Sequence, residues 1–264
     1  MYASFEVRHP AVAGQFYPAD SRELTRTVRE MLGATRGSGR SPRALIVPHA
    51  GYRYSGLLAA RAYAELRDAG RHPTRVALIG PAHRVPVEGL TVPRCFAFAT
   101  PLGDVHVDRD AVADMLAAGT AVASDRAHAK EHSLEVQLPF LQEALGDFLL
   151  VPMLVGYEEP DTVAAVLDPL VDDETLLIVS TDLSHFHEVA EARTLDHRTI
   201  ERIRELDTTL YGDDACGCHA VNALNAIAKR RGWDVRMLGY RNSADGGGPD
   251  YRVVGYGAFA YTTH

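Results

Sequence analysis

The chain has 264 residues, of which 46% are hydrophobic and 23% are charged, so it is long enough to bury a large core without disulfide support. Its formal net charge of -8 at pH 7 argues against nucleic acid or an anionic membrane as the main partner. The three cysteines exclude a disulfide framework, and no apolar stretch approaches the length of a membrane span.

The first third of the chain predicts two helices. One is expected to begin near Asp20 and to end at Leu32, because Asp20 and Glu23 fit a capping pair and a Gly- and Ser-containing stretch follows. This stretch is too short to mark a domain boundary. A second, Ala-rich helix is expected over 55–69, closed by Gly70, and it should connect two strands in a right-handed βαβ unit.

Four apolar runs rich in Val, Ile and Leu are typical of strands in a parallel sheet that is covered on both faces. The runs are 44–49, 76–83, 149–155 and 176–185. We therefore expect an α/β fold, a single three-layer domain over residues 1–264 with a largely parallel central sheet. Three runs end in a histidine, at His49, His83 and His185, and ligands of such sheets gather at the carboxyl ends of the strands. Three imidazoles at one sheet edge would make a metal site or an acid/base site.

The rest of the chain predicts edge strands, further helices and a closing pair of strands. Three prolines in the stretch 85–107 indicate loops and edge strands. Helices are expected over 109–118, 133–145, 163–171, 189–206 and 219–231, and Pro139 should start or kink the second of them. The closing strands are expected over 234–240 and 253–261. The glycine-rich stretch between them has no helix after it, which indicates a flexible turn and not a phosphate loop.

His49 and His83 each follow an apolar run, with a proline nearby and small residues alongside. Proline fixes the local backbone, and small neighbours let a ligand approach closely. Either histidine alone could cap a strand end through backbone hydrogen bonds. As a pair on adjacent strands, they favour metal ligation.

The segment 182–187 supplies a third set of polar side chains. Asp182 could orient a histidine that binds a metal, and His185 could act as a general acid or base. His187 is two residues further on and is expected to face elsewhere. The segment 131–135 is ambiguous, because acidic residues in the first turn of a helix explain it as well as a functional site does.

Cys216 opens the last expected helix, and Cys218 and His219 follow it closely. A helix N-terminus favours the thiolate, so Cys216 could be a metal ligand or a reactive thiol. Zinc-finger spacing is absent. A hydrolase with a nucleophilic cysteine, a histidine and an aspartate remains an alternative, because such groups can meet in space without a local signature.

The other histidines with no such context are expected to be solvated, because they fall in loops or on expected helix surfaces. They are His9, His72, His106, His128, His197 and His264. None of them enters the predicted site.

Six short segments along the chain match a known family in the same order. Each segment alone is a weak signal, but the six together are specific. They are Ala13-Gly14-Gln15-Phe16-Tyr17-Pro18, Pro48-His49-Ala50-Gly51-Tyr52, Gly80-Pro81-Ala82-His83, Glu131-His132-Ser133-Leu134-Glu135, Ser180-Thr181-Asp182-Leu183-Ser184-His185 and Cys216-Gly217-Cys218-His219. In these segments the chain resembles the MEMO family, including prokaryotic members associated with AmmeMemoRadiSam gene sets. The resemblance implies an α/β fold related to the LigB-like class III extradiol dioxygenases.

The resemblance also implies a set of site residues. The dioxygenases hold non-haem Fe(II) with two histidines and a glutamate, and another histidine serves as acid/base. By motif match, His49 and His83 fall on the two histidine ligands, and Cys216 falls where the MEMO family has a cysteine instead of the glutamate. His185 matches the acid/base histidine. The other expected site residues are His132 and Asp182 beside the chemistry and Tyr52, Glu135 and His219 in the pocket.

Two imidazoles and a thiolate suit Fe(II) or Cu, with Zn as a further option, and the MEMO family is reported to bind iron or copper. The leading hypothesis is a metal-dependent, dioxygenase-like oxidoreductase that acts on a small molecule or peptide. The alternative is a non-catalytic module that binds a peptide or small ligand in the same pocket. Partner proteins of the AmmeMemoRadiSam set are expected, and the few cysteines and the lack of a signal-peptide pattern favour a cytoplasmic location.

Overall fold

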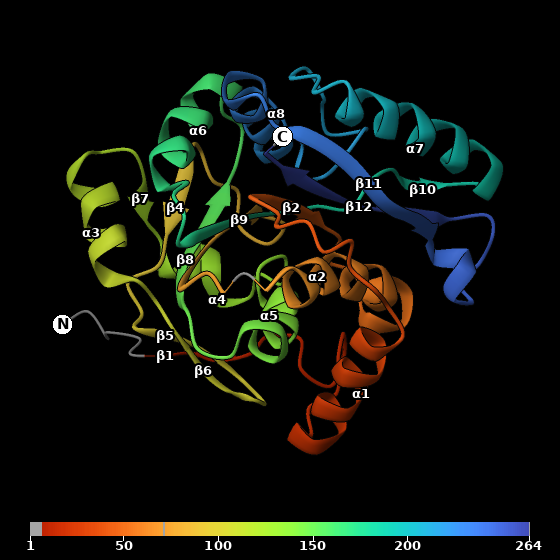
Figure 1. Ribbon diagram of the computed structural model, residues 1–264, viewed down its shortest axis with the longest axis horizontal. Coiled ribbons are helices and arrows are strands. Elements are labelled where there is room, and N and C mark those ends of the chain that lie inside the picture. The colour runs from red at the N-terminus through yellow and green to blue at the C-terminus, as the bar shows by residue number, and fades with distance from the viewer. Residues whose placement is uncertain (1–6, 71, 264) are drawn as a thin grey trace.

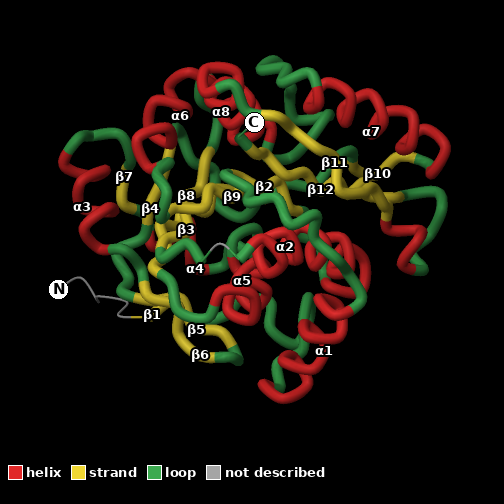
Figure 2. The backbone as a smooth tube through the Cα atoms, viewed as in Figure 1, coloured by secondary structure: helices red, strands yellow, loops and turns green. Residues whose placement is uncertain are grey.

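The computed structural model describes residues 7–70 and 72–263, and its main feature is a nine-stranded sheet (Figures 1 and 2). The strand order is β10-β12-β2-β9-β3-β8-β4-β7, and β11 pairs with β12. Four parallel strands form the centre: β2 (Ala44–Val47), β9 (Thr175–Ser180), β3 (Arg75–Pro81) and β8 (Leu149–Val155). They coincide with the four apolar runs, and almost all of their residues are buried, so the predicted centre of the sheet is confirmed.

Shorter or antiparallel strands flank this centre. On one side lie β12 (Val253–Thr262), β11 (Asp234–Asn242) and β10 (His185–His187), and on the other lie β4 (Leu90–Val92) and β7 (Val122–Ala123). A separate small sheet contains β1 (Val7–Arg8), β5 (Ala97–Thr100) and β6 (Gly103–His106). Two of the edge strands that the prolines indicated, β5 and β6, therefore belong to a second sheet.

Helices cover both faces of the main sheet, which confirms the α/β architecture. Figure 1 shows α1 (Ser21–Gly33), α2 (Leu57–Ala69) and α5 (Leu138–Leu145) below the sheet. Above it lie α6 (Pro160–Leu167), α7 (Val189–Arg204) and α8 (Cys218–Arg231). The remaining helices, α3 (Arg109–Ala117) and α4 (Asp125–Ala129), lie toward the edge that carries β7 and β4.

The helix ends follow their local sequence signals. The Asp20 side chain accepts a hydrogen bond from the Glu23 amide at 2.9 Å and starts α1, as predicted. Gly70 ends α2 in the left-handed conformation that glycine adopts without strain. The predicted helix over 133–145 is shorter than expected, because the chain first makes a 3-10 turn and α5 begins at Leu138 with Pro139 in its first turn.

The order of the central strands corrects one prediction. β2 and β3 are not adjacent, because β9 is inserted between them and pairs with both. The histidines that follow β2 and β3 are therefore separated by two strand spacings, roughly 9.6 Å between the strand axes. This separation leaves room for two imidazole rings to face each other above the end of β9.

Most of the histidines that were expected to be solvated are exposed, and one is not. His9, His72, His106 and His197 are exposed, whereas His264 lies outside the described residues. His128 is buried, and its Nε2 donates a hydrogen bond to the Thr91 carbonyl, so the prediction for His128 was wrong. Within the part of the chain that the structure describes, no helix has the length and apolar character needed to cross a bilayer.

Candidate metal centre

Three histidines converge at the carboxyl ends of the central parallel strands. His49 follows β2, His83 follows β3, and His132 comes from the segment that connects α4 to α5. One nitrogen from each ring lies within 4.8 Å of one nitrogen from each of the others. The ring centroids of His49 and His83 are 5.1 Å apart, and those of His83 and His132 are 4.8 Å apart. These three side chains could hold a metal ion.

The hydrogen bonds around His49 determine which of its nitrogens is available. Its Nδ1 lies 3.0 Å from Ser180 Oγ, which itself donates to the Ser133 carbonyl at 2.6 Å. Ser180 therefore has no second proton to give, so Nδ1 of His49 carries the hydrogen and Nε2 keeps its lone pair. Burial, and then the charges of His83 and His132, lower the pKa of His49, which keeps the ring neutral. A neutral imidazole fixed in this tautomer is ready to ligate a metal through Nε2.

A buried carboxylate holds the other two histidines. Glu131 Oε1 lies 3.0 Å from His83 Nδ1 and also accepts the backbone amides of His132 and Ser133 at 2.8 and 2.9 Å. Burial opposes ionisation of Glu131, but the hydrogen bond and charge of His83 and the Ser133 amide lower its pKa. The ionised carboxylate accepts the Nδ1 proton of His83, which leaves Nε2 of that ring as the free donor atom.

His132 is held less tightly than the other two rings. Its Nδ1 is 3.2 Å from Glu131 Oε1, but the angle is unsuitable for a hydrogen bond and this buried nitrogen has no partner among the described residues. Burial lowers the pKa of His132 to about 4, so the ring is neutral at physiological pH. A buried imidazole nitrogen without a partner is costly in an apo protein, and coordination of a cation would relieve that cost. His132 was predicted as a catalytic residue, and the structure places it in the histidine group.

Cys216 places a sulfur atom beside His49. Its Sγ is 3.4 Å from His49 Nε2 and accepts the Asp182 amide at 3.3 Å. Gly217 makes the approach possible, since a Cβ at that position would lie 2.8 Å from the Cβ of Thr181. Burial, and then the charge of Asp182, raise the pKa of the Cys216 thiol to about 12. Without a metal this residue is therefore a thiol and not a thiolate.

Asp182 lies behind both His49 and Cys216. Its Oδ1 accepts the backbone amide of His49 at 2.8 Å, and its carbonyl accepts the amide of Cys216 at 3.3 Å. Burial raises the pKa of Asp182 to about 7. The sequence assigned Asp182 an orienting role, and in the structure it fixes the backbone that carries two candidate ligands.

A cleft of about 240 Å³ opens onto these residues. Its walls are His83, His185, His187, Gly212, Asp213 and Cys216. His185, the predicted acid/base residue, is half-buried, and burial lowers its pKa. His187 was expected to face elsewhere, but it lines the same cleft.

Three predicted pocket residues lie elsewhere. Tyr52 is buried and donates to the Val136 carbonyl at 2.8 Å. His219 contacts the Glu158 carbonyl at 3.0 Å and does not line the cleft. Glu135 is fully buried and binds the N-terminal segment, where it forms an ion pair and accepts three further hydrogen bonds. Its partners are Arg8, the amides of Ala11 and Val12, and the Tyr17 hydroxyl.

Sequence reasoning did not identify the residues that hold the imidazoles. Ser180 is the last residue of a buried strand, and a polar side chain at the carboxyl end of such a strand was the available signal. Gln137, whose Nε2 donates to Ser180 Oγ at 2.9 Å, lies in the 3-10 turn before α5 and had no local signal.

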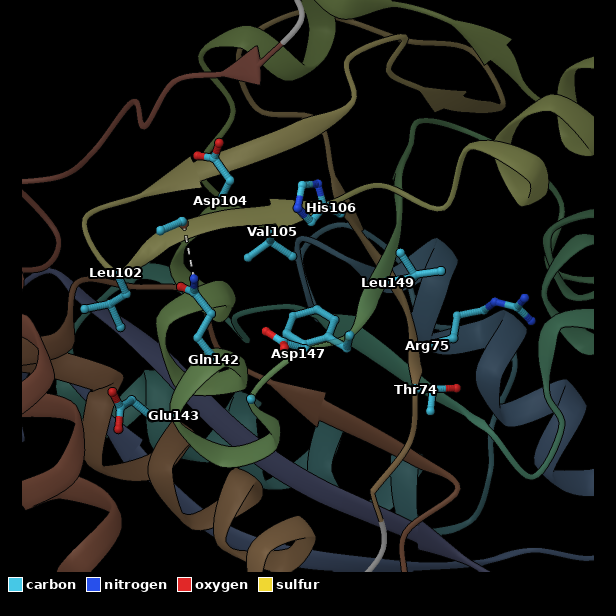
Figure 3. Close-up of a pocket in the computed structure, with 13 residues that line it drawn as sticks. Thr74, Arg75, Leu102, Asp104, Val105, His106, Gln142, Glu143, Asp147 and Leu149 are labelled. Atoms are coloured by element: carbon cyan, nitrogen blue, oxygen red, sulfur yellow. Dashed lines mark hydrogen bonds between the residues drawn. The ribbon is translucent and has the colours of Figure 1, made fainter.

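A second cavity lies at the opposite end of the central strands from His49 and His83. It has a volume of about 720 Å³ and is lined by Thr74 and Arg75 at the start of β3 and by Leu149 at the start of β8 (Figure 3). These are the amino ends of the strands, whereas His49 and His83 follow the carboxyl ends. Cavity volume alone therefore does not identify the candidate site. The convergence of donor atoms identifies it.

Comparisons with known proteins agree with this description. A family model described as "Memo-like protein" matches residues 8–260. A MEMO1 family protein of Methanobrevibacter smithii is 34% identical over 276 residues, which cover 95% of this chain and 98% of that one. A MEMO1 family protein of Methanopyrus kandleri is 35% identical over 280 residues, with 96% and 98% covered.

A solved structure gives the same fold at lower similarity. An uncharacterized protein of Escherichia coli K12 matches with a TM-score of 0.53 and 13% identity, over 85% of this chain and 100% of that chain. This likeness concerns the fold alone. On the match of the family model and the identity to these relatives, the chain belongs to the Memo-like protein family.

Proposed function

We propose that this protein is a metal-dependent oxidoreductase whose ion is Fe or Cu. His49 and His83 would bind the ion through Nε2, and Cys216 would supply the third donor atom. The observation that carries the proposal is the convergence of three imidazoles, one of them beside a thiol, with the Nδ1 positions of two of them already occupied by Ser180 and Glu131.

The donor set fits a transition metal. Nitrogen at about 2.1 Å and sulfur at about 2.3 Å from one tetrahedral ion lie roughly 3.6 Å apart. The separation between His49 Nε2 and Cys216 Sγ is 3.4 Å, so both atoms could bind the same ion with little movement. Imidazole and thiolate ligands suit Fe, Cu and Zn and do not suit Mg or Ca. His132 lies in the same histidine group. It would serve as an additional ligand or lie beside a coordination position of the metal that is open to substrate.

The bound metal would supply redox chemistry and polarise a substrate held in the cleft. The protein residues would do the rest. His185, neutral and at the cleft wall, would take a proton from a bound substrate or return one to it. Asp182 would hold the backbone of His49 and Cys216, and Glu131 would fix the orientation of His83.

Metal analysis of protein purified without chelators tests the proposal, and an anomalous X-ray signal would identify the element. We expect about one Fe or Cu per chain in the wild type and loss of that metal in Cys216→Ala. Cys218→Ala is a matched control, because Cys218 is a buried thiol two residues away whose pKa burial raises to about 11. Protein that is metal-free and refuses Fe, Cu and Zn at micromolar concentration contradicts the proposal.

A binding module for a peptide or small ligand is the second candidate. Two exposed aromatic side chains favour it. Phe186 is 59% exposed and lies between the cleft residues His185 and His187, and Tyr211 is 53% exposed and precedes the cleft residue Gly212. Aromatic rings at the rim of a cleft are typical recognition elements. Ligand affinity that survives in a His49→Ala/His83→Ala double variant, without turnover, would support this candidate over the oxidoreductase.

A metal-free cysteine hydrolase has less support. A nucleophilic cysteine needs a lowered pKa, whereas burial and the charge of Asp182 raise that of Cys216. The same thiol would lose its proton on binding a metal ion, since metals bind the thiolate. The electrostatics of Cys216 thus favour ligation over nucleophilic attack.

A further inference from the structure

A strained bulge shapes the wall of the cleft at β10. This strand pairs with β12 so that His185 is opposite Val254 and His187 is opposite Val253, which leaves Phe186 as an extra residue. Phe186 has a φ of 67°, a left-handed conformation that is strained for a bulky residue. The guanidinium of Arg252 lies over its exposed ring at 4.2 Å and helps to hold it outside.

The two histidines that flank the bulge line the same cleft. With Phe186 turned outward, His185 and His187 both line the cleft, together with His83 and Cys216. Bulges often re-aim a side chain beside an active site and are retained for that reason. The backbone strain at Phe186 therefore coincides with the presentation of a second imidazole on this wall.

A carboxylate orients that second imidazole. Glu191, in the first turn of α7, has its Oε2 3.2 Å from Nδ1 of His187. The pair lies at the edge of the cleft, because the His187 side chain is 34% exposed and that of Glu191 is 61% exposed. With Nδ1 facing Glu191, Nε2 of His187 is the nitrogen left for a molecule in the cleft. The titratable groups that share this cleft with His187 are His83, His185, Asp213 and Cys216.

We propose that His187, oriented by Glu191, is a second acid/base residue of the cleft and binds the anionic part of a small ligand held at the metal. This inference rests on the proposed metal-dependent function and deepens it. The acting form of His187 carries a proton on both ring nitrogens: Nδ1–H faces Glu191, and the Nε2–H bond breaks as its proton passes to the ligand anion. The neutral ring then regains this proton from solvent, which reaches the Glu191 side of the pair. His185 serves the more enclosed side of the same ligand.

Azide binding to the Co(II)-loaded full-length protein tests the proposal without requiring turnover. Azide is a small anion that can occupy an open metal position and accept a hydrogen bond, and visible absorption of Co(II) reports both loading and azide binding. We expect His187→Gln to load Co(II) normally and to bind azide about tenfold more weakly at pH 7, the size of one hydrogen bond to an anion.

The role of Glu191 is tested by a double-variant cycle. Glu191→Gln should weaken azide binding by a smaller factor, and the double variant should bind azide no more weakly than His187→Gln alone, because the two residues act as a unit. Glu188→Gln is the matched control, since it removes an exposed carboxylate at the same end of α7 and should leave azide affinity unchanged.

The outcomes separate the two proposals. A wild type that refuses Co(II) contradicts the metal-dependent function and this inference with it. Normal Co(II) loading combined with no azide binding, or with equal azide affinity in wild type and His187→Gln, overturns the role of His187 alone.

Discussion

The Sγ atom of Cys216 lies 3.4 Å from Nε2 of His49, although 167 residues separate the two in the chain. The contact joins the end of β2 to the turn that opens α8. It depends on the Asp182 carboxylate, which binds the His49 amide, and on the Asp182 amide, which donates to Cys216 Sγ. The predictions below test whether this arrangement binds a metal and what holds it in place.

Ser180→Ala should weaken metal binding although Ser180 is not a ligand. The substitution removes the acceptor that keeps the proton of His49 on Nδ1. Loss of such an outer partner costs about 10- to 100-fold in metal affinity, and competition with a chromogenic chelator would measure it. Ser184→Ala is the control, because among the described residues the buried Ser184 hydroxyl forms no hydrogen bond to a histidine. Equal affinity in Ser180→Ala and wild type would show that the tautomer of His49 is held by other means.

Cys216 in the metal-free protein should react slowly with iodoacetamide at pH 7.5. Burial and the charge of Asp182 raise its pKa to about 12, so little thiolate is present. Asp182→Asn should accelerate alkylation, because it removes the negative charge that disfavours the thiolate. Mass spectrometry of peptides that contain Cys216 would follow the reaction over time. Rapid alkylation of the wild type would instead point to a reactive nucleophile.

The metal-free protein should lose stability as pH falls from 7 toward 5. Burial lowers the pKa values of His49 and His132 below the ordinary histidine value of about 6.5, so below that pH the unfolded chain binds protons that the folded chain excludes. Asp182, whose pKa is raised to about 7, acts in the opposite direction and loses its stabilising proton as pH rises. Urea unfolding at several pH values would show a shallower decline in His132→Gln and a steeper one in Asp182→Asn. The exposed residue His106 supplies the control, His106→Gln, and a decline that His132→Gln leaves unchanged would refute this explanation.

Glu135→Gln should reduce stability without removing a metal ligand. The Glu135 carboxylate is fully buried with Arg8, and breaking a buried ion pair costs about 3–5 kcal/mol. Glu143→Gln is a matched control, because its partner Arg29 is exposed and a surface pair contributes roughly 0–1 kcal/mol. Unfolding curves and metal analysis of both variants would separate the two effects. Loss of metal from folded Glu135→Gln would contradict this prediction and show that Glu135 contributes to metal binding.

Much of the fold could be read from local sequence signals. The four apolar runs became the central parallel strands, and Asp20 and Gly70 capped their helices as expected. These features depend on short-range periodicity and capping, which a single sequence displays. The order of the strands depends instead on long-range pairing. No local signal indicated that β9 would separate β2 from β3.

The site could be predicted only in part, for a similar reason. His49, His83 and Cys216 lie at element ends where functional groups are expected. The structure groups His49 and His83 with His132, and it places the Cys216 sulfur beside His49. Glu135 lies only four residues from Glu131, but the two carboxylates point to different partners, a difference fixed by tertiary packing. His187 was misplaced although residues two apart in a strand share a face, so the alternation alone places His187 on the side of His185. The bulge between them could not be predicted, because its left-handed residue is Phe186, which no propensity would suggest.

The insertion of β9 between β2 and β3 also sets the order in which the centre can be assembled. When residues 49 and 83 have been synthesised, the chain still lacks β9, the strand that fixes their spacing. Residue 216 is synthesised after β9. Fragments that stop before residue 175 should therefore capture cations poorly, even though they contain every imidazole of the cluster. Loading with metal then belongs to the last stage of folding, after the long-range contacts have formed.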